Sequence, residues 1–217
     1  WSQVEARLGG GIKSPRVEAS WVLRDLRTAA PDAVELASEV RVDFLAKDGV
    51  AAVSGLARVP RIEPVTLEAS FPFGFRVAEG RLDWVDPTGV LRGRVRVPET
   101  DLAVFREFVP GVRRVAGRVG AEIVLGNSLL APSIDGVARV TGGLLEVHRG
   151  VPVVEDVNGV CRFDGKTFRF VDTAATVGAG RLRLSGGGDF SDVKNVRFDL
   201  RLVGSEVLVH RDRNFRL

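Results

Sequence analysis

The sequence predicts an all-β chain, a long antiparallel sheet with one short helix. Apolar or small residues alternate with polar residues over much of the chain, most clearly from Val119 to Val209. A period of two places the two sets on opposite faces of a strand. Gly, Pro and Asp interrupt the alternation at turn positions. The predicted sheet therefore has one apolar face and one charged face.

The N-terminal half contains several predicted strands joined by recognisable turns. The strands are expected over 17–23, 40–44, 65–75, 82–84 and 91–97. Asp48-Gly49 is a hairpin signal, and Asp86-Pro87-Thr88-Gly89 is a second turn. Pro72 falls on the polar phase of its strand and predicts a bend or a sheet edge there. The segment from Thr28 to Val40 is expected to begin with a short helix or a loop at Pro31-Asp32.

The C-terminal half begins with the one predicted helix and continues in strands. Pro98 to Asp101 offers an N-cap, the apolar residues from Leu102 to Val109 form one stripe, and Pro110-Gly111 ends the helix, which is expected over 101–109. Strands follow over 134–140, 157–163, 180–184 and 196–202. We treat 1–100 and 101–217 as two continuous parts of one sheet. The shared spacing after Pro15 and Pro132 favours a stacked, quasi-one-dimensional arrangement.

Composition excludes several classes of protein. The 217 residues are 45% apolar and carry a formal charge of +3, from 31 basic and 28 acidic residues. The two signs are interleaved without a basic block, so no nucleic-acid surface is indicated. The single cysteine, Cys161, excludes an internal disulfide and is expected to be a small buried residue. The chain contains no Met and starts at Trp1, so we expect a fragment of a longer protein, and no apolar run reaches the ~20 residues that span a bilayer.

No group of residues predicts catalysis, a metal site or a cofactor. His148 and His210 each lie near a predicted strand end and are interpreted as solvated residues. Ile12 separates Gly from Lys in Gly9-Gly10-Gly11-Ile12-Lys13-Ser14, which excludes a phosphate-binding loop. Acidic residues alternate singly with Arg, as on a solvated sheet face with cross-strand ion pairs. We therefore expect no enzyme.

The region from Phe105 to Leu208 contains an ordered series of short blocks with Gly and Pro at turn positions. These are Val109-Pro110-Gly111 to Gly117, Leu125-Gly126, Leu130-Ala131-Pro132, Asp135-Gly136 to Thr141-Gly142-Gly143, Val154 to Gly159, Phe163-Asp164-Gly165, Gly178-Ala179-Gly180 and Leu184-Ser185-Gly186-Gly187. Through the ordered series, rather than any one block, this region resembles the C-terminal region of TamB, within the AsmA-like family of bacterial envelope proteins. The first hundred residues share the alternation without distinct blocks.

The resemblance implies a curled antiparallel sheet, a taco-shaped half-pipe with a hydrophobic interior, similar to bridge-like lipid transfer proteins. Proteins of this family are anchored in the inner membrane, cross the periplasm and meet an Omp85-type barrel, TamA or BamA, at the outer membrane. The implied function is phospholipid transport between the two membranes. The alternative is a scaffold for the assembly of outer-membrane β-barrel proteins, and a passive β-solenoid stalk is a third possibility. The family has no catalytic residues to carry over.

The apolar face needs a covering layer, which a second sheet or acyl chains could supply. One short helix leaves little chain for a second layer, so acyl chains are the preferred interpretation. The predicted lining of the lipid groove shares the apolar phase of its strands and consists of Ile123, Leu125, Ile134, Val140, Val157, Phe163, Phe168, Phe170, Leu182, Leu184, Phe198, Leu200 and Leu202. Arg162, Arg169, Arg183 and Arg201 are expected on the opposite face.

Overall fold

The fold was obtained as a computed structural model that describes residues 1–11, 14–27, 35–59, 62–78, 81–108, 111–147, 151–191 and 195–207. The described residues form thirteen strands and one short helix. In chain order the elements are β1 (Ser2–Gly11), β2 (Ser14–Arg27), β3 (Glu35–Lys47), β4 (Val50–Arg58), β5 (Val65–Ala78), β6 (Arg81–Val85), β7 (Arg92–Asp101), η1 (Leu102–Phe108), β8 (Arg114–Asn127), β9 (Pro132–Glu146), β10 (Val154–Asp164), β11 (Thr167–Val177), β12 (Gly180–Asp189) and β13 (Arg197–Ser205). His148 and His210 lie outside the described residues, as do the start of the 28–40 segment and Val109.

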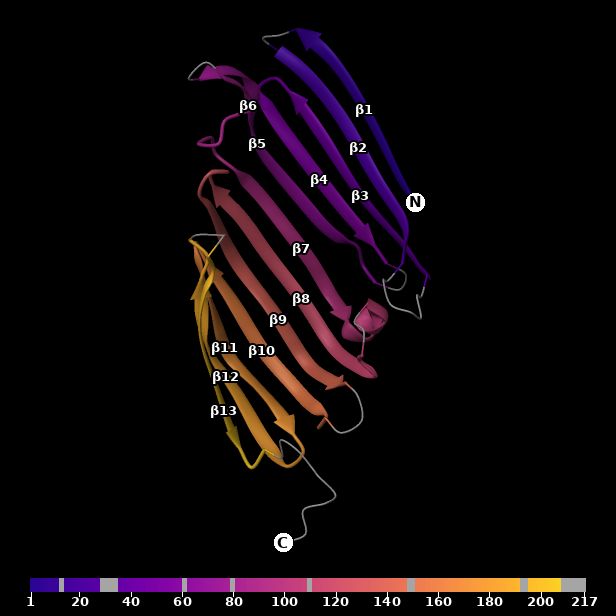
Figure 1. Ribbon diagram of the computed structural model, residues 1–217, viewed down its shortest axis with the longest axis vertical. Coiled ribbons are helices and arrows are strands. Elements are labelled where there is room, and N and C mark those ends of the chain that lie inside the picture. The colour runs from indigo at the N-terminus through magenta and orange to yellow at the C-terminus, as the bar shows by residue number, and fades with distance from the viewer. Residues whose placement is uncertain are drawn as a thin grey trace. The chain divides into compact units, whose positions relative to one another are not determined.

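The strands form one open antiparallel sheet, which confirms the predicted fold class. The order is β1-β2-β3-β4-β5-β7-β8-β9-β10-β11-β12-β13, and β6 pairs with β5 away from this path. Apart from β7, which pairs with β5 instead of β6, each strand lies beside the one before it in the chain, as in a meander (Figure 1). All described strands belong to this sheet, so a second sheet packed on the first is not found among them.

The chain divides into two compact units, which are described separately below. The first comprises Trp1–Pro98, Ala121–Gly136 and Phe163–Lys166. The second comprises Glu99–Gly120, Val137–Arg162 and the chain from Thr167 onward. The boundaries between the units fall inside four strands, β7, β8, β9 and β10, so the units are not separate folds.

In the first unit the sheet curls toward its apolar face. Val17, Ala46, Ala51 and Phe71 follow one another in register across β2, β3, β4 and β5. Ala46 and Ala51 have no exposed surface (0% each). Residues of β2 and β5 have Cα atoms within 8 Å of each other, whereas three strand spacings in a flat sheet come to about 14 Å. Part of the apolar face is therefore covered by the sheet itself.

The predicted hairpin at Asp48-Gly49 is confirmed. The turn joins β3 to β4 directly after the pair formed by Lys47 and Val50. Asp48 has a φ of 53° and Gly49 a φ of 82°. Two consecutive positive φ angles define the two-residue turn that matches the twist of a hairpin.

Pro72, where the sequence predicts a bend or a sheet edge, is not at an edge, because it pairs with Val50 of β4. It marks a change of pairing partner on the other side of β5. On the side of β5 that faces away from β4, the residues from Thr66 to Ser70 pair with β7. The residues from Phe73 onward pair with β6 on that side. Pro72 lies between these two stretches, so its missing N–H interrupts no ladder there. The nearby turn is also confirmed, since the Gly89 N–H donates to the Asp86 carbonyl oxygen at 3.1 Å.

The predicted helix is present but is a 3₁₀ helix. It covers Leu102–Phe108, within the expected 101–109. The Asp101 Oδ1 accepts a hydrogen bond from the Ala103 N–H at 2.8 Å, and Asp101 itself ends β7. So short a segment gains few bonds of the α-helical kind, and the tighter 3₁₀ turn is common in such connections.

Gly49→Ala is expected to lower the free energy of unfolding by about 1 kcal/mol, because a side chain at a left-handed position is disfavoured by that order. Urea unfolding of the purified protein measures it. Gly9→Ala is the matched control, since no atom lies within 4 Å of a methyl group there and its φ is not in the positive region. Equal losses for the two variants would contradict the assigned turn.

Candidate functional site

Seven of the predicted groove residues lie on one face of the second unit. In an antiparallel pair, residues directly opposite each other share a face. Phe168 pairs with Gly188, which pairs with Phe198. In the same way, Phe170 pairs with Gly186, which pairs with Leu200. Between β12 and β13, Leu184 pairs with Leu202 and Leu182 with Gly204. The register thus brings together Phe168, Phe170, Leu182, Leu184, Phe198, Leu200 and Leu202.

Val140 and Val157 meet on the surface of β9 and β10 in the same unit. A Cβ built on Gly143 would lie 2.8 Å from the Val157 Cβ and 3.3 Å from the Val140 Cγ1. The Val140 and Val157 side chains therefore lie on the face from which a side chain at position 143 would project. On β10, Gly159 and Cys161 continue the phase of Val157 and lead to Phe163. Arg162 lies between Cys161 and Phe163, on the opposite phase.

The remaining predicted residues belong to the first unit. A Cβ on Gly93 would lie 3.3 Å from both the Ala69 Cβ and the Leu125 Cβ, so Leu125 shares a face with the apolar residues of β5. Ile123 has the same phase on β8. Ile134 alternates with Ser133 and is anchored through its N–H, which donates to the Gly165 carbonyl oxygen at 2.7 Å.

The exposure of the predicted lining depends on the strand. The ten residues from Ile123 to Leu184 are half-buried. The three on β13 are exposed, Phe198 by 64%, Leu200 by 47% and Leu202 by 64%. Within the described part of the chain, β13 pairs only with β12, so these side chains lack neighbours on one side. The apolar face of the second unit is therefore open to other molecules at β13.

Glycines in β12 allow aromatic rings of β11 and β13 to meet above them. The Phe168 and Phe198 ring centroids are 6.0 Å apart in an edge-to-face arrangement. A Cβ on Gly188, the residue between them, would lie 2.5 Å from the Phe168 Cε1. Any side chain at that position would displace the ring. This ring cluster was not predicted from the sequence, although Gly186-Gly187-Gly188 inside a strand is a signal for such a close approach.

The predicted arginines lie on the charged face. Arg169 pairs with Gly187, Arg183 with Ala174 and Arg201 with Ser185, all on the phase opposite to the phenylalanines. Arg162, Arg169, Arg183 and Arg201 are exposed. This segregation agrees with the predicted two-faced sheet.

Ion pairs on the charged face join residues within a strand as well as across strands. Arg24 and Glu39 form the expected cross-strand pair at 2.8 Å between Nε and Oε2. Arg7 with Glu5 and Arg41 with Asp43 lie two residues apart on one strand, each pair at 2.8 Å. Long Arg side chains reach along a strand as easily as across it. The expectation of cross-strand pairing alone was therefore incomplete.

Three titratable groups of the described residues have shifted pKa values. The hydrogen bond from the Arg41 guanidinium lowers the pKa of Asp43 below 3.8, and the same bond raises the pKa of Arg41. Burial raises the pKa of the Cys161 thiol. Cys161 is half-buried, and a thiol whose pKa is raised is less reactive at neutral pH.

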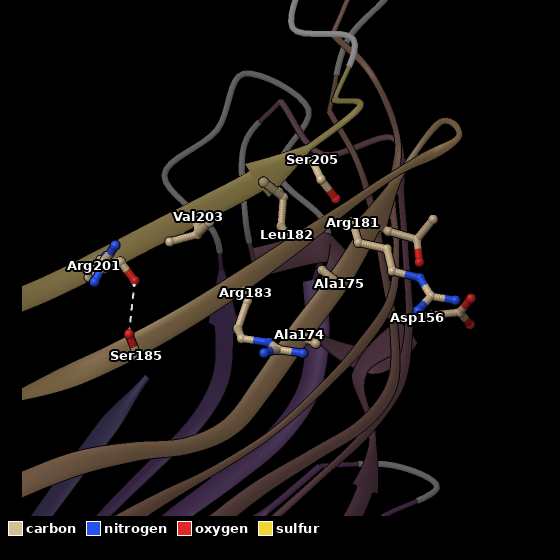
Figure 2. A pocket seen from close by; sticks show the side chains of 11 residues that line it. Asp156, Ala174, Ala175, Arg181, Leu182, Arg183, Ser185, Arg201, Val203 and Ser205 are labelled. Atoms are coloured by element: carbon tan, nitrogen blue, oxygen red, sulfur yellow. Dashed lines mark hydrogen bonds between the residues drawn. The ribbon is translucent and has the colours of Figure 1, made fainter.

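A hollow of about 670 Å³ lies on the charged face of the second unit (Figure 2). Three arginines surround it, Arg181, Arg183 and Arg201, and Ser185, Ser205, Ala174 and Val203 provide short side chains between them. The Ser185 hydroxyl lies 3.4 Å from the Arg201 carbonyl oxygen and donates to it. The alternation of charges predicts a solvated face for these arginines, and the hollow was not predicted from it.

In the described ranges, no three His, Cys, Asp or Glu side chains are grouped so that they could hold a metal ion. No helix among those residues is long and apolar enough to cross a membrane. Comparison of the chain with protein-family models, with curated proteins and with solved structures finds no match.

The Asp43 carboxylate is expected to titrate below 3.8, since Arg41 stabilises its charged form. A lowered folded-state pKa adds stability above the unfolded pKa, and this stability is lost as the pH falls through the folded pKa. NMR titration of the side-chain carboxyl carbon measures the midpoint. In Arg41→Gln the midpoint should rise toward 3.8, while Arg16→Gln, whose partner is Glu18, should leave it unchanged. An Asp43 midpoint that Arg41→Gln does not move would contradict the assignment.

Proposed function

We propose that the apolar face binds phospholipid acyl chains and forms part of a hydrophobic groove for lipid transport between bacterial membranes. The observation that carries this proposal is the register across β11, β12 and β13, which places the predicted apolar side chains on one face. No described element covers that face at β13, where Phe198 and Leu202 are each 64% exposed. A lipid tail is an occupant of matching chemistry.

The energetics of such a face suit a conduit. Burial of a methylene group contributes about 0.8 kcal/mol, so a chain of about 16 carbons gains on the order of 10 kcal/mol. A lipid leaves a similar free energy behind when it departs from a bilayer. When the free energy of the lipid is similar in the membrane and on the sheet, the lipid can move along the sheet without being held tightly at one site.

Both units expose apolar residues on their edge strands. In the first unit the curl buries Ala46 and Ala51 completely, and Phe44 packs edge-to-face on Phe73 at 5.9 Å, but on β1 Val4 is 70% and Leu8 83% exposed. In the second unit the open residues are those of β13. We assign acyl-chain contact chiefly to β11–β13 because seven of the predicted lining residues lie there.

In this proposal the chain acts in the periplasm as part of a TamB-like protein anchored in the inner membrane. An Omp85-type barrel, TamA or BamA, is the proposed outer-membrane partner. The proposal includes no catalytic step, metal or cofactor.

A scaffold for outer-membrane β-barrel assembly is the second candidate. It is supported by β13, which pairs with β12 alone among the described strands. An incoming strand could pair with the backbone of such an edge. Edge pairing needs backbone groups, whereas acyl-chain binding needs the side chains of the apolar face, so side-chain substitutions separate the two functions.

Leu200→Arg is expected to lower the transfer of a fluorescent phospholipid between phosphatidylcholine vesicles by up to about a hundredfold. A guanidinium in hydrocarbon is disfavoured by roughly 2.5–3.5 kcal/mol, and each 1.4 kcal/mol corresponds to about tenfold. Leu200 is 47% exposed, so the variant should fold, which circular dichroism checks.

Asp199→Arg is the matched control, because Asp199 is the adjacent residue on the charged face and pairs with Gly187. It changes the net charge more than Leu200→Arg does, so a purely electrostatic effect would be larger in the control. We expect near-parental transfer. Equal losses in both folded variants, or full transfer by Leu200→Arg, would reject the lipid groove in favour of the scaffold.

A further inference from the structure

The three arginines around the hollow of Figure 2 occupy neighbouring positions on the charged face. Arg181 and Arg183 are two residues apart on β12, and Arg201 pairs with Ser185, two residues beyond Arg183. Positions two residues apart in a strand are roughly 7 Å apart. Arg183 is thus close to both of the other arginines, whereas Arg181 and Arg201 are four residues apart in register. An anion between Arg183 and Arg201 would offset the repulsion of their like charges.

Some of the described arginines on the charged face are paired with acidic neighbours, and others, including the three around the hollow, are not. Arg7, Arg16 and Arg41 each form an ion pair with an acidic residue two positions away. Among the described residues, Arg181, Arg183 and Arg201 form no ion pair with a carboxylate. Asp156 is the one acidic residue lining the hollow, and it lies on the Arg181 side (Figure 2). Arg183 pairs with Ala174 and Val203 and has no acidic residue directly opposite it, whereas Asp199 lies two residues from Arg201 on the same face of β13.

The floor of the hollow leaves space for a ligand. Ala174, Val203 and Ser185 have short side chains, so the longer arginines can turn inward over them. The volume of about 670 Å³ accommodates a phosphate group together with part of the molecule that carries it. The Ser205 hydroxyl lies on the same wall, because Ser205 pairs with Arg181.

We propose that this hollow binds a phosphate group, with Arg183 and Arg201 as its principal ligands. A guanidinium presents two parallel N–H donors that match two phosphate oxygens. Binding places a negative charge among three positive ones and relieves their repulsion. The phosphate belongs either to a soluble ester or to a phospholipid head group, since the recognising chemistry is the same. The site lies on the face opposite to the acyl-chain residues and does not depend on the lipid groove.

The test measures binding of inorganic phosphate by calorimetry, and binding of phosphatidylglycerol and phosphatidylcholine vesicles by sedimentation, at one ionic strength. Arg183→Gln should weaken binding about tenfold, because a charge-assisted hydrogen bond is lost. Arg41→Gln removes the same charge from an arginine already paired with Asp43 and should leave binding unchanged.

Phosphate binding that depends on Arg183 supports the site with a soluble ester as its source. Binding only to phosphatidylglycerol vesicles, again dependent on Arg183, supports the site with a lipid head group as its source. The proposal is overturned if the protein binds neither inorganic phosphate nor either kind of vesicle. It is also overturned if Arg183→Gln and Arg41→Gln weaken binding equally.

Discussion

Strand register is the constraint on which the rest of the structure depends. Because side chains alternate between faces, a slip of one residue would move every apolar side chain to the charged face. The Asp48-Gly49 turn sets the register of β3 and β4. Bulges correct the phase elsewhere. The register shifts between Phe170 and Thr173, where Asp172 has a φ of 49°, and between Arg24 and Leu26, where Asp25 has a φ of 55°. An extra residue at each bulge keeps the following side chains on their proper faces.

A single-layer sheet with one apolar face has to cover that face, and the two units do so differently. The first unit curls until residues of β2 and β5 approach within 8 Å, which buries small alanines and brings aromatic rings together. In the second unit, glycines in β12 let Phe168 reach Phe198. The edge strands stay exposed in both units, β1 in the first and β13 in the second. The uncovered apolar residues and the unpaired arginines of the hollow lie on opposite faces of the same strands. One sheet thus offers two surfaces of different chemistry.

Period-two alternation predicted most strands and the two faces because each depends on local sequence alone. The Asp48-Gly49 and Asp86–Gly89 turns were predictable for the same reason. The bulges at Asp25 and Asp172 were not, because an Asp in the left-handed region has no distinct pattern. The curl of the first unit depends on contacts between distant strands. The arginine hollow was missed because its members come from β12 and β13, and their proximity follows from register. Leu102–Phe108 was predicted as a helix, but its 3₁₀ geometry depends on contacts that local apolar spacing does not reveal.

The central claim is that acyl chains cover the apolar face of β11–β13. Native mass spectrometry of the protein, purified without detergent from bacterial membranes and envelope extract, tests it most directly. The account predicts bound species with phospholipid masses, released at moderate collision energy and depleted in Leu200→Arg relative to Asp199→Arg. A lipid-free parent protein that is folded by circular dichroism would contradict the account.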